Sequence, residues 1–251
     1  LQGLSDEQLV PYRKKLQIVF QDPHSSLNPA FTIFGSLQDP LKQYGITSKA
    51  ERRKIIGDLL EAVNMRREYM DRYPHEFSGG QRQRIGIARA LCIDPELVVC
   101  DEAVSALDVS VQAQVLKLLM DLKIKRNLTY IFITHDLSVT EYLCDRIAVM
   151  YLGRIVELAD TADIYADTLH PYTQALLSAI PVADLDRKTD RIVLEGDVPS
   201  PIDPPSGCPF HPRCPHAIAR CSAEVPALTR HIRNGRDHLV ACHLVDTGQD
   251  T

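Results

Sequence analysis

Two acidic side chains stand at the end of a short apolar run. Residues 97–100 read Leu-Val-Val-Cys and are followed directly by Asp101 and Glu102. An apolar run of this length is typical of a buried strand, and open α/β sheets bind their ligands at the carboxyl ends of such strands. A carboxylate there can hold Mg²⁺, usually through water, and a second one can orient or deprotonate an attacking water. Taken alone, however, the pattern more often marks a solvated strand end.

A pair of glycines precedes a segment whose pattern is helical. Residues 77–84 read Phe-Ser-Gly-Gly-Gln-Arg-Gln-Arg, and the segment continues through residues 85–91. Gly79 and Gly80 would let a ligand approach the backbone closely, and the helix N-terminus would present unpaired N–H groups to a phosphate. A plain Gly-Gly turn capped by Ser78 accounts for these residues at least as well when they are taken by themselves.

The elements that must position these groups alternate along the chain. Apolar runs predict strands at residues 16–20, 97–100 and 130–134, and a hairpin whose strands are 146–150 and 154–157. Helices are expected near residues 33–44 and 48–64, from 77–80 to about 92, and after Asp108. Behind Asp108, five apolar side chains fall on one helical face: Val111, Val115, Leu118, Leu119 and Leu122. Strands that alternate with helices predict a three-layer α/β fold.

Composition narrows the class of protein. The chain has 251 residues, of which 45% are hydrophobic and 24% are charged, which is ordinary for a globular protein. Its length allows one α/β core and a smaller appendage. The net charge of −5 gives no general reason to expect a nucleic-acid partner. No apolar run reaches the ~18 residues that a membrane-spanning helix needs.

Five short motifs, in order and spacing, resemble the ATP-binding subunits of ABC transporters. Ser78–Gln81 is similar to the signature motif of that family, and residues 97–102 are similar to its Walker B strand. Gln21, in Val-Phe-Gln-Asp-Pro, resembles the glutamine of the Q-loop. Ser105–Asp108 resembles the D-loop, and His135, in Ile-Thr-His-Asp, resembles the switch histidine. The resemblance implies a P-loop NTPase-type ABC ATPase core.

Four of these positions would form one half of an ATP site if the resemblance holds. Asp101 would help to hold Mg²⁺, and Glu102 would be the general base or would position the attacking water. His135 would contact the γ-phosphate, although an isolated histidine is more often structural. Gln21 would sense Mg²⁺ and the attacking water, and its loop would touch the membrane subunit. The implied activity is ATP hydrolysis within an ABC-type translocase.

The remaining motifs would act across a dimer interface. The resemblance implies that the signature motif contacts the γ-phosphate of ATP held by the opposite subunit, through Ser78, Gly79, Gly80 and Gln81. It also implies that the D-loop crosses the interface, with Ser105 and Asp108. Both assignments predict that the chain works as half of a pair.

Two features depart from the family pattern. Ala103 follows the Asp-Glu pair where the family usually has proline, which would stiffen the turn. In addition, no glycine is followed by lysine, so the P-loop motif Gly-x-x-x-x-Gly-Lys-Ser/Thr is absent from the sequence. Because the family places that loop before the Q-loop and the first residue is Leu1, we expect an N-terminal truncation that removed the Walker A strand. The isolated chain is then expected to be inactive as an ATPase.

The C-terminal part resembles the extension of oligopeptide and dipeptide importer ATPases. The resemblance rests on residues 170–177, His-Pro-Tyr-Thr-Gln-Ala-Leu-Leu, and on Pro199–Cys214. We expect an ATPase core at residues 1–165, with a helical subdomain at about 33–95, and an extension at residues 166–251. The implied function is import of di- or oligopeptides. Importers of nickel or other small solutes share many of these features, and a soluble ABC ATPase that serves no transporter is a further alternative.

The resemblance also implies partners and a location. The chain would pair with a second ABC ATPase subunit, identical or related, and the pair would bind two transmembrane permease subunits. A periplasmic or extracellular peptide-binding protein would take part indirectly, and no nucleic acid is expected. Such subunits are peripheral proteins on the cytoplasmic face of the inner (plasma) membrane. Their cofactors are ATP and Mg²⁺.

Four cysteines cluster near the end of the chain, separated by five, six and twenty residues: Cys208, Cys214, Cys221 and Cys242. In a cytoplasmic protein such a cluster is more often metal-binding than disulfide-bonded. Four thiolates suit a [4Fe–4S] cluster or a structural Zn²⁺. The resemblance to peptide importers favours the iron–sulfur cluster, and reduced cysteines that pack a small loop domain are the third alternative.

Overall fold

Two units make up the chain in the computed structural model, which describes residues 3–22, 27–180 and 191–245. The first unit is Leu1–His135 and the second is Asp136–Thr251. These units are defined by their internal contacts, whereas the predicted boundary between residues 165 and 166 rests on sequence composition and resemblance and stays a prediction. Part of the predicted Q-loop stretch, residues 23–26, lies outside the described residues.

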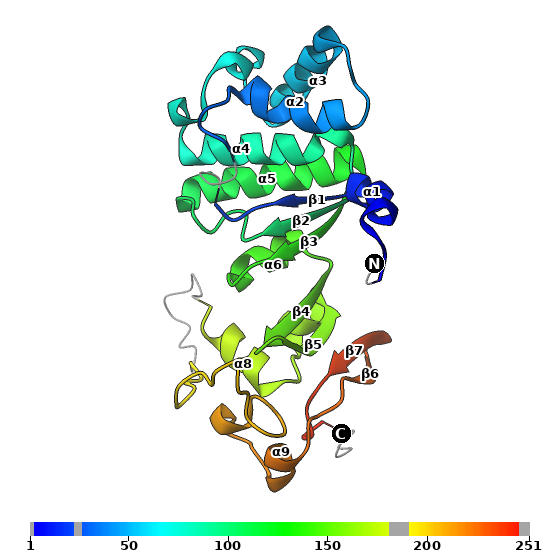
Figure 1. The fold of residues 1–251 in the computed structure, drawn as a ribbon. Coiled ribbons are helices and arrows are strands. Elements are labelled where there is room, and N and C mark those ends of the chain that lie inside the picture. The colour runs from blue at the N-terminus through cyan, green and yellow to red at the C-terminus, as the bar shows by residue number, and fades with distance from the viewer. Residues whose placement is uncertain (1–2, 23–26, 181–190, 246–251) are drawn as a thin grey trace. The chain divides into compact units, whose positions relative to one another are not determined.

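A parallel sheet forms the base of the first unit. Its strands β1 (Leu16–Val19), β2 (Leu97–Asp101) and β3 (Thr129–Ile133) lie in that order, with β2 in the middle (Figure 1). The register pairs Ile18 with Val99 and Val99 with Ile131. All three strands therefore end at the same edge, and the residues that follow them in the chain enter the space above that edge. The predicted strands are confirmed to within one residue at each end.

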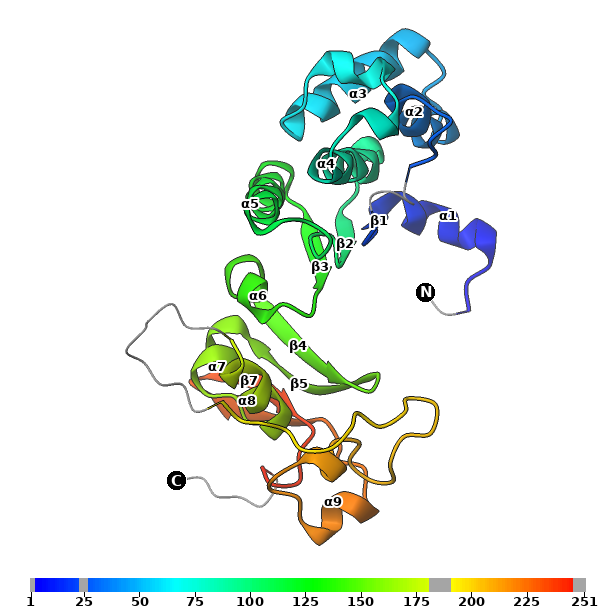
Figure 2. The same cartoon turned by 90° about the vertical axis from the view of Figure 1, so that its left-hand side faces the viewer.

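Two helices lie side by side along one face of this sheet, as Figure 1 and Figure 2 both show. They are α4 (Gly79–Ala90) and α5 (Val109–Arg126). Helix α5 begins after the predicted N-cap Asp108. Of the five apolar residues predicted on its inward face, Val115, Leu118, Leu119 and Leu122 are buried and Val111 is half-buried. On the opposite face of the sheet, Ile18, Ile131 and Ile133 are 41%, 50% and 47% exposed.

A group of helices is inserted between β1 and β2. Helices α2 (Ile33–Gln43) and α3 (Lys49–Ala62) have their own apolar core, which includes five fully buried side chains: Ile33, Leu37, Leu41, Ile56 and Leu60. Both helices begin where a hydroxyl caps the first turn, at Thr32 and Ser48. Both were predicted from the sequence, whereas α1 (Asp6–Lys15) was not. Helix α1 buries none of its residues, so it has no apolar periodicity to detect, and a Ser5–Gln8 capping box fixes its start.

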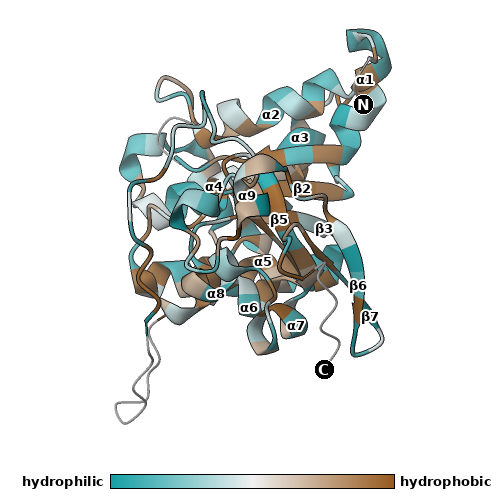
Figure 3. Ribbon diagram, turned by 90° about the horizontal axis from the view of Figure 1, so that it is seen from below, coloured by the Kyte–Doolittle hydropathy of each residue, from teal (hydrophilic) through white to brown (hydrophobic). Residues whose placement is uncertain are grey.

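An antiparallel sheet organises the second unit. Its order is β4 (Arg146–Tyr151), β5 (Arg154–Asp160), β7 (Arg236–Val240) and β6 (Thr229–Arg233), and the predicted β4–β5 hairpin is confirmed. The described residues of this unit also form the short α-helices α6 (Leu137–Leu143), α7 (Thr161–Ala166), α8 (Pro171–Ser178) and α9 (Ala219–Ala223). The β6–β7 hairpin is largely hydrophilic in Figure 3. Asn234 and Gly235 both have positive φ at its turn, and this Asn-Gly pair was a hairpin signal that the sequence analysis missed.

Candidate functional site

Three of the predicted site residues meet at the carboxyl edge of the parallel sheet. Gln21 follows β1, Glu102 follows β2 and His135 follows β3. Gln21 Nε2 donates a hydrogen bond to Glu102 Oε2, and His135 Nδ1 lies 3.2 Å from Glu102 Oε1. Because β2 lies between the other two strands, its terminal carboxylate is reached from both sides. Each carboxylate oxygen of Glu102 thus has a partner from the segment that follows a different neighbouring strand.

The backbone at Glu102 is held in an uncommon conformation. Its φ angle is 44°, in the left-handed region, where a residue with a Cβ is strained by about 1–3 kcal/mol. The Glu102 N–H donates to the carbonyl of Ile133 at 2.9 Å. The Glu102 carbonyl accepts from the N–H and the hydroxyl of Ser105, at 3.1 and 3.0 Å. These bonds fix the turn at Ala103, whose side chain is buried, without the proline that the family usually has there.

The other acidic residue has a simpler environment. Asp101 is the last residue of β2 and pairs in register with Ile133 of β3. Its side chain is half-buried at the same edge of the sheet as Glu102. The structure therefore delivers both carboxylates to the edge that the strand pattern predicts.

The signature motif forms the first turn of α4. Ser78 is the N-cap: its Oγ accepts from the N–H of Gln81 at 3.4 Å, and its own N–H donates to Gln81 Oε1 at 3.0 Å. This reciprocal pair is a capping box. The two glycines differ, because a Cβ on Gly79 would lie 3.8 Å from Leu107 Cδ2, whereas a Cβ on Gly80 would lie 2.3 Å from Val111 Cγ1. Only Gly80 is required by packing, and Gly79 is half-buried.

The D-loop connects the strained turn to α5. Ser105 caps the Glu102 carbonyl, and the N–H of Leu107 donates to the carbonyl of Val104 at 3.2 Å. Asp108 is the N-cap residue, and its backbone carbonyl accepts from Gln112 at 2.8 Å while its side chain makes no capping bond. The exposed Asp108 carboxylate is therefore left for groups outside this helix.

The four clustered cysteines are free thiols in the second unit. Cys208, Cys221 and Cys242 are buried, Cys214 is half-buried, and the Cys208 N–H donates to the Cys221 carbonyl at 2.8 Å. Burial raises the pKa of Cys208 and Cys214, and it raises the pKa of Cys242 to about 11; neighbouring thiols in the cluster add to each shift. Within residues 3–22, 27–180 and 191–245, no group of three or more Cys, His, Asp or Glu side chains is arranged to hold a metal ion. The geometry gives no support to an iron–sulfur cluster or to zinc.

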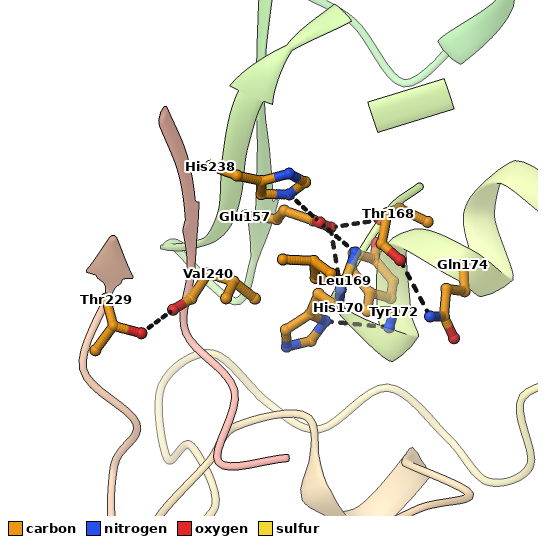
Figure 4. Close-up of polar contacts among 9 residues, drawn as sticks. All are labelled: Glu157, Thr168, Leu169, His170, Tyr172, Gln174, Thr229, His238 and Val240. Carbon is orange, nitrogen blue, oxygen red and sulfur yellow. Dashed lines mark hydrogen bonds and ion pairs between the residues drawn. The ribbon is translucent and has the colours of Figure 1, made fainter. Parts of the chain in front are cut away.

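A second glutamate, which the sequence analysis did not identify, organises the second unit (Figure 4). Glu157 of β5 is fully buried and accepts four hydrogen bonds. Their donors are His238 Nε2 at 2.7 Å, Thr168 Oγ1 at 2.7 Å, the Leu169 N–H at 2.6 Å and the His170 N–H at 3.3 Å. Burial acts to raise the pKa of Glu157, but the hydrogen bonds that its side chain accepts outweigh it and lower the pKa. The carboxylate is therefore held in its charged form.

The His-Pro-Tyr segment beside Glu157 has a structural explanation. His170 is the N-cap of α8 and its Nδ1 accepts from the Tyr172 N–H at 3.1 Å, while Pro171 occupies the first helical position. Tyr172 packs against Tyr151 of β4 and Phe210, with ring centroids 4.8 and 5.4 Å away. Because Phe210 is close in sequence to Cys208 and Cys214, the segment joins the sheet to the loop that carries these cysteines.

Comparison with known families assigns both parts of the chain. A family model described as "ABC transporter" matches residues 2–105, and one described as "Oligopeptide/dipeptide transporter, C-terminal region" matches residues 156–221. A probable peptide ABC transporter ATP-binding protein of Sinorhizobium fredii is 53% identical over 96% of this chain and 68% of its own length. A putative oligopeptide transport ATP-binding protein of Bacillus subtilis is 50% identical over 97% of this chain and 74% of its own length.

A solved structure shares the fold. It is a dimeric ATP-binding cassette in a post-hydrolysis state bound to ADP and Pi, with a TM-score of 0.56 and 30% identity. The likeness covers 63% of this chain and 68% of that one. The predicted ABC ATPase fold is thereby confirmed.

Proposed function

Because the chain belongs to the ABC transporter family of ATP-binding proteins and carries the oligopeptide/dipeptide transporter C-terminal region, we propose that it drives peptide import with the energy of ATP. The observation that carries this proposal is the convergence of Gln21 and His135 on the two carboxylate oxygens of Glu102. Residues far apart in the sequence meet there at the ligand-binding edge of a parallel sheet.

We assign the hydrolytic roles at this edge as follows. Glu102 takes the proton of the water that attacks the γ-phosphate, or orients that water, and Asp101 helps to hold the Mg²⁺ that accompanies ATP. His135 turns from Glu102 to the γ-phosphate, and Gln21 turns to Mg²⁺ and the water. Because Gln21 and His135 both contact Glu102 here, we propose that the two side chains leave Glu102 when the nucleotide arrives.

We assign the signature motif to the ATP of the opposite subunit. The first turn of α4 presents unpaired N–H groups, and the half-buried Gly79 leaves its backbone accessible to a phosphate. Ser78 and Gln81 fix that turn through their capping box, and Ser105 and Asp108 of the D-loop face the same interface. The dimeric state of the similar cassette that binds ADP and Pi supports pairing.

The peptide substrate is proposed from the relatives. Both curated proteins are named for peptide or oligopeptide transport, and the matching C-terminal region is named for the same substrates. We propose a functional division into an ATPase core, residues 1–165, with a helical subdomain at about 33–95, and an extension, residues 166–251. Nickel or another small solute is the alternative cargo.

The proposed partners follow from the same assignment. A second ATPase subunit completes the pair, two permease subunits bind it, and a peptide-binding protein outside the membrane delivers the cargo. The described parts of the chain contain no helix long and apolar enough to cross a membrane. From the transporter family of the relatives, we propose a peripheral position on the cytoplasmic face of the membrane, held there by the permeases.

A metal at the four cysteines, Cys208, Cys214, Cys221 and Cys242, is kept as a separate proposal. Burial and mutual repulsion raise the pKa of three of these thiols, and a bound cation would reverse that effect. Anaerobic purification followed by iron, sulfide and zinc analysis tests it. About four irons per chain with a broad visible band would support the [4Fe–4S] cluster. Zinc alone would support the alternative, and no metal would leave the thiols as packing groups.

The experiment that tests the transport proposal measures ATP hydrolysis and uptake of a labelled tripeptide in proteoliposomes. Residues 1–251 contain no Gly-Lys pair, so we expect no turnover from them alone. The assay therefore uses a pair with permeases in which a P-loop segment from a relative precedes residue 1. Peptide-stimulated turnover coupled to uptake is expected. Turnover that responds to Ni²⁺ and not to peptide would overturn the peptide assignment, and no turnover would overturn the ATPase assignment.

A further inference from the structure

The first turns of α4 and α5 are in contact where a valine side chain of α5 packs against a glycine of α4. Val111, in the first turn of α5, packs against Gly80, where a Cβ would come within 2.3 Å of Val111 Cγ1 and 3.7 Å of Val111 Cβ. Real Cβ atoms do not approach another carbon that closely, so any side chain at position 80 must displace Val111 or α4. The neighbouring Gly79 has room for a methyl group.

The same two helices are tied on either side of this contact. Before it, Gly79 faces Leu107 of the D-loop. Beyond it, Arg84 Nη2 donates to Gln114 Oε1 at 3.0 Å. Figure 1 and Figure 2 show α4 and α5 running alongside each other from these ends. The signature motif and the D-loop are therefore linked by contacts between α4 and α5, and the Gly80–Val111 contact sets how closely the two helices approach.

We propose that Val111 is a positioning residue for the ATPase reaction: by packing on Gly80 it fixes the first turn of α4 relative to the D-loop, and so fixes where Ser78 and Gly79 meet the phosphate. The inference rests on the proposed contact of the signature motif with the partner's ATP. A misplacement of about 1 Å can lower a reaction rate about 100-fold. Adding or removing a methyl group at this contact should therefore change the rate measurably.

Burial separates this role from ordinary packing. Val115, one turn later on α5, is fully buried and contributes to the core, whereas Val111 is only half-buried. Removing two methyl groups from Val115 therefore costs more stability than removing them from Val111. Val115→Ala is thus a matched control that removes the same atoms from the same helix away from Gly80.

The test uses residues 1–251 in a complex with permeases and a partner ATPase that carries a P-loop, because the signature motif serves the partner's nucleotide. The variants are Val111→Ala, Gly80→Ala, the double variant and Val115→Ala. We expect Gly80→Ala to lower the partner site's kcat about 10-fold and Val111→Ala to lower it several-fold. In the double variant the new methyl occupies the space that Val111 vacates, so kcat should return to within about twofold of the parent.

The controls decide between a positioning and a structural role. Val115→Ala should lower Tm more than Val111→Ala while leaving kcat per folded complex unchanged. If Val111→Ala and Gly80→Ala lower only Tm, and Ser78→Ala lowers kcat, the positioning role is overturned and the signature assignment stands. If Ser78→Ala also leaves kcat unchanged, the signature assignment itself fails and the positioning role fails with it. Should Gly80→Ala fail to fold, Val111→Ala still decides.

Discussion

Each unit of the molecule contains a glutamate that contacts a histidine, and the two pairs differ in nearly every other respect. The Glu102 side chain is 27% exposed, its His135 partner is 71% exposed and its backbone lies in the left-handed region. The Glu157 side chain and its His238 partner are 0% and 1% exposed, and Glu157 lies in β5 beside a bulge in its pairing with β4. Glu102 has two side-chain partners that can leave it, whereas Glu157 accepts four hydrogen bonds from fixed groups.

This difference provides criteria that separate a carboxylate suited to catalysis from one with a structural role. A catalytic base must meet water and exchange partners, so exposure and replaceable neighbours are requirements. A buried charge must be neutralised by many donors that never leave, because an unpaired buried charge is costly. By these criteria Glu102 suits the reactive role proposed for it, whereas Glu157 links β5, β7 and the start of α8.

The largest expected effect separates the two glutamates by activity. Glu102→Gln keeps the shape of the side chain but removes its basicity, so ATP turnover should fall about 100-fold or more. Glu157→Gln should leave turnover per folded molecule unchanged. Steady-state phosphate release from the P-loop-bearing pair measures both, and equal losses in the two variants would contradict the assignment of roles.

Stability should separate them in the opposite direction. Glu157→Ala leaves His238, Thr168 and two backbone N–H groups without their acceptor, so the free energy of unfolding of the second unit should fall by about 3–5 kcal/mol. Glu102→Ala removes a partly exposed carboxylate and should change stability by less than about 1 kcal/mol. The measurement is urea unfolding, with hydrogen exchange used to monitor each unit separately. A larger loss in Glu102→Ala would reverse the comparison.

Acid should weaken the second unit through the residues around Glu157. Burial lowers the pKa of His170 from 6.5 to about 4, although nearby Glu157 acts to raise it. Between these values the unfolded chain binds a proton that the folded chain does not, so stability should fall by about 3 kcal/mol as the pH drops from 6.5 to 4. The pKa of Glu157 is lowered from 4.5, so its contribution is complete above pH 4.5 and is lost as the pH falls through its folded pKa.

His170→Asn is the control for that prediction, because asparagine keeps an N-cap acceptor but does not titrate. In this variant the fall in stability between pH 6.5 and pH 4 should flatten. Thermal melts at half-unit pH steps measure it. A variant whose pH profile matches that of the parent would show that another group carries the dependence.

The smallest effect tests the backbone. Glycine tolerates the φ of 44° at Glu102, so Glu102→Gly should be more stable than Glu102→Ala by about 1 kcal/mol. At Glu157, whose φ is not positive, the order should reverse, because glycine weakens a strand relative to alanine. Chemical unfolding of the glycine and alanine variants at both positions gives the sign of the stability difference at each. A Glu102→Gly variant no more stable than Glu102→Ala would mean that the turn at Glu102 stores no strain.

Part of the fold and of the candidate site could be predicted from the sequence, for reasons that particular residues illustrate. Strand β2 and helix α5 were predictable because their apolar periodicity matches the face that they bury. The meeting of Gln21, Glu102 and His135 was implied by motif order, although the hydrogen bonds between them were not. Glu157 was missed because a buried charge has no sequence period: its partners come from β7 and from the segment before α8.

The glycine pair shows a subtler limit. Sequence reasoning treated the two glycines alike, as a close approach to phosphate or as a plain turn, whereas the structure distinguishes them by their contacts with α5 and the D-loop. Residue spacing along the chain does not reveal which of two glycines faces a neighbouring helix. For the cysteines, their clustering and the family resemblance predicted a metal site that the geometry of the described residues does not support.

The insertion of α2, α3 and α4 between β1 and β2 has a consequence for how the chain folds. Leu16 pairs with Leu97, so the strands can join only after the whole intervening segment has become compact. The inserted helices have their own apolar core and mostly local contacts, and such segments gain structure fastest. In a refolding experiment the amides of α2 and α3 should therefore become protected early, with those that pair β1 to β2 closing last.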